Sequence, residues 1–220
     1  MSLAFAMAAV SGFVDGLGVS TIAGVFPSFM SGNTTGAGVA LGVGDLGTLA
    51  RIGTAIPLYV LAVTVGALVF TRWTRARPVI WTVVLILLSG FIVAATLLPP
   101  VPPTGFALSS IPILACLVLP MGLLNMSLRR VAGTTIGLGY VTGTLVSLGE
   151  SIAAVIARKA SGAPVILFSG LWISFFLAAA LGGFAASRIG PWAAGVPILA
   201  MLVLLLLDRA TRAQGLVVHN

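Results

Sequence analysis

The chain has 220 residues, of which 59% are hydrophobic and only 7% are charged, and its formal net charge is +7. A soluble domain carries about 25% charged residues, so this composition excludes an ordinary soluble protein and predicts an integral membrane protein. The basic residues lie in short gaps between apolar runs, which is typical of cytoplasmic membrane loops, and we expect no nucleic-acid partner.

Six apolar runs are long enough for a helix that crosses the hydrocarbon core of a bilayer, which requires about 20 residues. In chain order they lie near residues 3–24, 52–71, 79–98, 109–128, 164–186 and 191–208. Two further stretches, 27–44 and 134–157, are rich in Gly, Ser and Thr, and we interpret them as discontinuous or re-entrant segments. The expected fold is therefore all-α, with six full transmembrane helices plus these two segments.

The loop charges favour this arrangement. The uncharged, proline-rich linker at 99–108 is expected outside the cell. Of the 11 basic residues, all except Arg51 and Arg188 then lie on the cytoplasmic side, together with both termini and a tail at 209–220. If both Gly-rich stretches crossed as full helices, the split would become nearly even.

The linker divides the chain into two halves that we interpret as a two-fold internal repeat. The repeats would be residues 1–98 and 109–208. Gly12 and Gly122 are 110 positions apart, and Gly32 and Gly143 are 111 apart. With three spans per half, the second half enters the membrane upside down, which gives an inverted repeat. Four crossings per half would instead give a parallel repeat.

Asp15 lies near the middle of the first predicted span, where a carboxylate costs about 2.5–3.5 kcal/mol. It is interpreted either as a protonatable or cation-binding group that lines a cavity, or as a structural partner of a buried donor. Its counterpart in the second half, Asn125, forms hydrogen bonds but does not titrate. Any proton coupling would therefore be confined to the first half.

A polar, glycine-rich phrase follows each of these residues, at Ser31–Thr35 and at Thr142–Thr144. Glycine lets the backbone leave helical geometry, and Ser, Asn and Thr cap a new helix start. Such a start points free N–H groups into the protein, which suits an anionic or carbonyl-bearing ligand. The alternative is that the small residues allow close helix packing in lipid.

The remaining candidates flank these phrases. Arg129 lies one helical turn after Asn125 and either reaches into a cavity or anchors the helix at the cytoplasmic surface. The predicted substrate-binding residues are Asp15, Ser31, Gly32, Asn33, Thr34, Asn125, Arg129, Thr142, Gly143 and Thr144, and the predicted pocket-lining residues are Phe29 and Tyr140. The tryptophans, Trp81 among them, are interpreted as lipid-facing residues of the interfacial belt.

No motif of a hydrolase, a phosphate-binding loop or a zinc protease occurs in the chain. Its single histidine, His219, lies one residue from the C-terminus, and its single cysteine, Cys116, lies in an apolar run. We therefore expect no enzymatic activity, no cofactor and no metal.

These motifs resemble those of the YoaK-like family of bacterial membrane proteins. The resemblance covers nearly the whole chain, and its most specific part is the Ser-Gly-Asn-Thr phrase at 31–34, downstream of Gly12-x-x-Asp15. Ser31 stands where the family has Thr, and Thr144 stands where the first half has Asn33. The resemblance implies a location in the inner membrane and a general topology, but no substrate.

Taken together, the residues predict a small secondary transporter or permease for a small polar or anionic solute. Its site would lie between the two repeats, near the bilayer midplane. The alternative is a non-transporting scaffold or accessory subunit that acts through Gly-rich packing faces, and a channel is a third reading. A homodimer is compatible with each of them.

Overall fold

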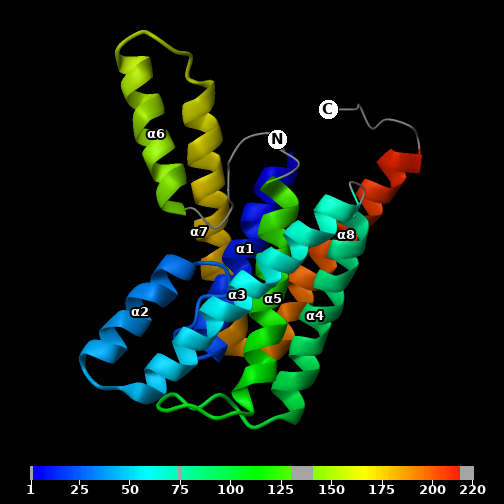
Figure 1. The fold of residues 1–220 in the computed structure, drawn as a ribbon. Coiled ribbons are helices and arrows are strands. Elements are labelled where there is room, and N and C mark those ends of the chain that lie inside the picture. The colour runs from blue at the N-terminus through cyan, green and yellow to red at the C-terminus, as the bar shows by residue number, and fades with distance from the viewer. Residues whose placement is uncertain (1, 74–75, 130–140, 214–220) are drawn as a thin grey trace.

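The structure, a computed structural model, describes residues 2–73, 76–129 and 141–213 (Figure 1). In this part of the chain the secondary structure is helical, which confirms the predicted all-α fold. The elements are α1 (Ser2–Thr21), α2 (Met30–Gly42), α3 (Leu46–Arg72), α4 (Arg77–Leu97), α5 (Ser110–Arg129), α6 (Val141–Ile156), α7 (Ala163–Ile189), the 3-10 helix η1 (Gly190–Ala194) and α8 (Gly195–Ala213).

Five helical stretches of the described chain are long and apolar enough to cross a membrane. Four of them are α1, α3, α4 and α5, and the fifth, Ala163–Arg212, contains α7, η1 and α8. The chain reverses direction between α7 and α8 at Gly190, whose φ of +57° suits glycine (Figure 1). These helices confirm a multi-pass membrane protein, whereas the count of six crossings and the internal repeat remain predictions.

The two Gly-rich stretches each contain a short helix. With 13 residues in α2 and 16 in α6, their lengths are about 20 and 24 Å, less than the roughly 30 Å of a hydrocarbon core. Neither helix crosses such a core alone. In Figure 1, α2 and α6 begin near the middle of the bundle and run toward its opposite ends.

The helices of the two halves pack against each other in a reciprocal way. The first helix of the chain, α1, packs most extensively on α7, and α5 packs on α3 and α4. The short helices lie outside this bundle, with α2 against α3 and α6 against α7. The start of α1 and the end of α8 lie at the same end of the bundle (Figure 1).

Close backbone contact holds α1 against α7. A Cβ atom added at Gly12, Gly16 or Gly182 would meet a backbone carbonyl oxygen of the facing helix. In lipid, helices associate through packing rather than through the hydrophobic effect, so small residues at a crossing let the backbones approach. The contact therefore depends on glycine at these three positions.

Two residues interpreted from the sequence as peripheral are in fact buried. Trp81 is 1% exposed, and its Nε1 donates to Ser127 Oγ at 3.1 Å, so its interpretation as a lipid-facing belt residue is wrong. Arg51 is 3% exposed, and its Nη1 donates to the carbonyl oxygens of Pro102 (3.1 Å) and Gly105 (2.9 Å). Arg51 thus lies on the same side of the bundle as the proline-rich linker, as expected, and ties that linker to α3.

We predict that Gly182→Ala lowers the free energy of unfolding by about 1–3 kcal/mol, because the added methyl group overpacks the contact between α7 and α1. The matched control is Gly38→Ala on α2, since nothing lies within 4 Å of a Cβ placed there. That control is expected to stay within about 1 kcal/mol of the wild type, on the stabilising side. Denaturant titration in mixed micelles measures both, and equal stability of the two variants would contradict the prediction.

Candidate functional site

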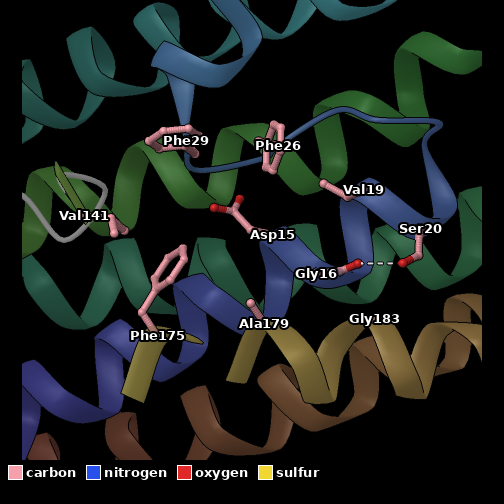
Figure 2. Close-up of a pocket in the computed structure, with 10 residues that line it drawn as sticks. All are labelled: Asp15, Gly16, Val19, Ser20, Phe26, Phe29, Val141, Phe175, Ala179 and Gly183. Carbon is pink, nitrogen blue, oxygen red and sulfur yellow. Dashed lines mark hydrogen bonds between the residues drawn. The ribbon is translucent and has the colours of Figure 1, made fainter. Parts of the chain in front are cut away.

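A cavity of about 460 Å³ lies between α1, α7, the start of α6 and the segment 22–29 that joins α1 to α2 (Figure 2). Its volume falls within the range of small-molecule sites. Most of its lining is apolar, from Val19, Phe26, Phe29, Val141, Phe175 and Ala179. The other lining residues are Asp15, Gly16, Ser20 and Gly183.

Asp15 contributes the carboxylate of this cavity and is 3% exposed. Its Oδ1 accepts a hydrogen bond from the backbone N–H of Ser28 at 2.6 Å, and its Oδ2 accepts one from Ser28 Oγ at 2.7 Å. Both readings of Asp15 from the sequence therefore have a structural counterpart: it lines a cavity, and it also pairs with buried donors.

The segment 22–29 reaches Asp15 because the chain turns back directly after α1. Ala23 and Gly24 both have positive φ, of 43° and 89°. Glycine adopts this conformation readily, and the Gly24 N–H closes the turn on the carbonyl oxygen of Val19 at 3.1 Å. The chain then returns along α1, which brings Phe26 and Phe29 over the middle of that helix (Figure 2).

Asn33 fixes the middle of the same segment. It is fully buried in α2, where its Oδ1 accepts from the N–H of Phe26 at 2.9 Å and its Nδ2 donates to the carbonyl oxygen of Phe26 at 2.6 Å. The side chain thus satisfies both backbone polar groups of Phe26, which lipid would leave unpaired. Asn33 positions a lining residue and does not itself line the cavity.

The other predicted residues of the first phrase lie around the start of α2. Phe29 lines the cavity, and Gly32 packs against the Phe29 ring. Ser31 and Thr34 are exposed, and Thr34 Oγ1 donates to the carbonyl oxygen of Met30 at 2.8 Å. Ser31 and Thr34 are therefore not brought to the cavity.

The predicted residues of the second half that the structure describes do not gather around the cavity. Asn125 is 8% exposed and lies between α5 and α3, where its Nδ2 donates to the Tyr59 hydroxyl at 2.7 Å, away from the Asp15 cavity. Val141 lines the cavity, and Thr142, Gly143 and Thr144 follow it in the first turn of α6, with Thr142 exposed. Tyr140 and the side chain of Arg129 lie outside the described part of the chain.

Sequence reasoning missed Ser28 and Phe175. Ser28 follows Pro27 in an unremarkable stretch, and only the fold brings it to Asp15. Phe175 lies in a long apolar run of α7, and its place in the cavity follows from the pairing of α7 with α1.

The fold and the cavity define a multi-pass α-helical membrane protein with a buried carboxylate in an apolar chamber. The chain matches the model of the family described as "Protein of unknown function (DUF1275)" over residues 3–207. It is 30% identical over 204 residues to the UPF0700 transmembrane protein RA0705 of Rhizobium meliloti (strain 1021), which covers 93% of this chain and 84% of that relative. No solved structure matches the chain.

The chain therefore belongs to the DUF1275 family. This membership confirms the expected resemblance to the YoaK-like family of membrane proteins, and the name of the relative confirms the expected placement in a membrane.

We predict that Asn33→Ala lowers the free energy of unfolding by about 2–3 kcal/mol, because two buried backbone groups of Phe26 lose their partner. Thr34→Ala, one position further along α2, serves as the control. Its hydroxyl is exposed, so its removal is expected to change the stability by about 0.5 kcal/mol or less. Thermal unfolding in detergent tests the pair, and an Asn33→Ala variant as stable as Thr34→Ala would refute the positioning role.

Proposed function

We propose that the protein is a small secondary transporter, or permease, that moves a small solute through the Asp15 cavity. The observation that carries this proposal is that both short helices begin there. Phe29, the N-cap of α2, and Val141, the first residue of α6, line the same cavity. Discontinuous helices that start inside the membrane and face a solute site recur in secondary transporters.

The helix starts explain why such a site binds a polar group. The first N–H groups of an α-helix lack partners within the helix, and they carry the positive end of its dipole. One short helix comes from each half, and the two run toward opposite ends of the bundle (Figure 1). A solute between them contacts both halves of the protein, as alternating access requires.

The reciprocal packing of the halves supports an inverted repeat with six crossings. Gly12 on α1 faces the backbone of α7, and its counterpart Gly122 on α5 faces that of α3. A Cβ at Gly122 would lie 3.0 Å from the carbonyl oxygen of Tyr59. Two repeats related by a two-fold axis would produce this pairing.

Asp15 is the group through which we propose that the cavity responds to a proton or a cation. Protonation, or a bound cation, weakens the two hydrogen bonds that the carboxylate accepts from Ser28. The segment 22–29, which carries Phe26 and Phe29, is then released from α1. Movement of these two rings would open the cavity toward one side of the membrane.

The alternative is a non-transporting scaffold or accessory subunit. One observation favours it: Gly38 and Gly42 on α2 have no heavy atom within 4 Å of an added Cβ, so this face is open to a partner helix or a second copy. Cysteines placed at Val19 and Gly38, after replacement of Cys116, separate the two readings. Solute-dependent protection of the cysteine at position 19 from a thiol reagent favours transport, and partner-dependent protection at position 38 favours docking.

We predict that Asp15→Asn abolishes gradient-driven accumulation of solute and preserves the fold, because the amide still accepts from the Ser28 N–H and donates to its hydroxyl. Accumulation is measured in proteoliposomes with a panel of labelled small amines, amino acids and carboxylic acids. It should fall at least about tenfold if one proton-responsive group drives it.

The control for this variant is Asp45→Asn. Asp45 is the exposed N-cap of α3, where it accepts from the Thr48 N–H at 3.0 Å, and asparagine caps a helix equally well. Saturable uptake in the wild type also separates a transporter from a channel. Undiminished accumulation in Asp15→Asn, or the absence of saturable uptake of any panel member by the wild type, would overturn the proposal.

A further inference from the structure

We propose that the Asp15 cavity selects a small organic cation, an amine or quaternary ammonium group that carries short alkyl substituents. This inference rests on the proposed function, because it names the class of solute for the same cavity. It replaces the polar or anionic solute that the sequence predicts with a solute of positive charge. A carboxylate set among aromatic rings carries the argument.

The charge of the cavity is negative and lacks a protein counter-ion in the described chain. Asp15 is the only formally charged side chain among the described lining residues. The ion pairs of the described residues join Asp208 to Arg77 and Arg212, and none includes Asp15. A carboxylate offers about four acceptor positions, of which Ser28 uses two and the backbone of Phe29 a third. A cationic group in the cavity therefore finds both an opposite charge and a free acceptor position.

Aromatic rings stand on both sides of this carboxylate. The rings of Phe26 and Phe29 are 5.6 Å apart and nearly perpendicular, at 80°, so they form two adjoining walls. Figure 2 shows the carboxylate directed into the space between these rings and that of Phe175. Ring faces carry negative potential and attract ammonium groups, which is how aromatic cages recognise quaternary amines.

The helix starts do not reverse this preference. The N-terminal ends of α2 and α6 each carry about half a positive charge, which falls off within the first turn. At short range they weaken the attraction of Asp15 for a cation, but they leave the attraction of the ring faces unchanged. An anion gains from the helix starts and is repelled by Asp15 and by the ring faces. A cation is repelled by the helix starts, but it gains from both the carboxylate and the rings.

The remaining lining favours an organic cation over an inorganic one. Val19, Val141 and Ala179 have apolar side chains, and the cavity volume of about 460 Å³ far exceeds that of a bare metal ion. A sodium ion would exchange its hydration shell for few oxygen ligands in such a chamber. Alkyl substituents on an ammonium group bury apolar surface against these side chains, which favours binding.

The test compares three probes of similar shape and different charge: choline (positive), its isostere 3,3-dimethylbutan-1-ol (neutral) and 3,3-dimethylbutanoate (negative). Their binding to the purified full chain in nanodiscs is measured by calorimetry. We expect choline to bind at least about tenfold more tightly than the alcohol, with the butanoate weakest. In Asp15→Asn the preference for choline over the alcohol should fall to about threefold or less, since only the rings remain. Equal binding of all three probes, or tightest binding of the butanoate, would overturn the inference.

A second pair of variants tests the rings and leaves the carboxylate intact. Phe175→Leu keeps the lining apolar and removes one ring, so choline binding should weaken by about fivefold and alcohol binding much less. Phe176→Leu is the matched control, because the next residue on α7 is 56% exposed and stacks on Trp172 outside the cavity lining. An identical loss of choline binding in both variants would contradict the proposed role of the Phe175 ring.

The inference and the transporter proposal fail in different ways. Choline binding that depends on Asp15, without saturable uptake of choline into proteoliposomes, would keep the cation site and overturn transport. Saturable uptake of a panel member, with no preference among the three probes, would keep transport and overturn the cation site.

Discussion

The backbone contact between α1 and α7 determines where the other groups of the cavity lie. Lipid offers these helices no hydrophobic force toward each other, so their association depends on atoms that touch. Asp15 lies between Gly12 and Gly16 on α1, and these glycines bring it within reach of Phe175 and Ala179 on α7. A wider crossing would move the lining of α7 away from the carboxylate. The glycines of the crossing are therefore needed for the lining residues of α7 to lie close to Asp15.

A carboxylate inside a membrane protein is costly unless it is paired, and the chain offsets that cost mainly with Ser28, beside the backbone of Phe29. Ser28 supplies two donors to Asp15, one from its backbone and one from its hydroxyl. The same bonds hold the segment 22–29 that carries two lining rings. Asn125, its counterpart in the proposed repeat, is neutral and pairs with Tyr59 between two long helices. The proposed repeats thus differ in their polar chemistry, and the carboxylate of the cavity comes from α1.

Much of the fold can be predicted from the sequence, because a helix that crosses lipid requires a long apolar run. The predicted runs correspond to α1, α3, α4, α5, α7 and α8, although α8 continues to Ala213, past the predicted end at residue 208. The polar phrases lie in the first turns of α2 and α6, but the expected capping of α2 by Ser, Asn or Thr is wrong, because its N-cap is Phe29 and no side chain caps it. An interruption in an apolar run can be recognised in a single sequence, because it depends only on neighbouring residues.

The direction in which each polar side chain points cannot be predicted from the neighbouring sequence, because it depends on the tertiary packing. Asp15 and Phe29 line the cavity, but Asn33 turns toward Phe26 because the segment 22–29 folds back beside it. Phe175 reaches the cavity only through the pairing of α7 with α1, which periodicity does not reveal. Loop charge likewise predicts the side on which Arg51 lies, but not its burial beneath the linker.

The burial of Arg51 has a mechanical consequence. Prolines restrict the linker and remove N–H donors from it, so its carbonyl oxygens need donors from elsewhere. Arg51 supplies two such bonds from α3, and the linker leads directly into α5. The linker between the halves is thereby held in place against α3. At this end of the bundle, sliding of α5 along α3 would have to break buried hydrogen bonds to a guanidinium group, whereas tilting about this fixed point would not.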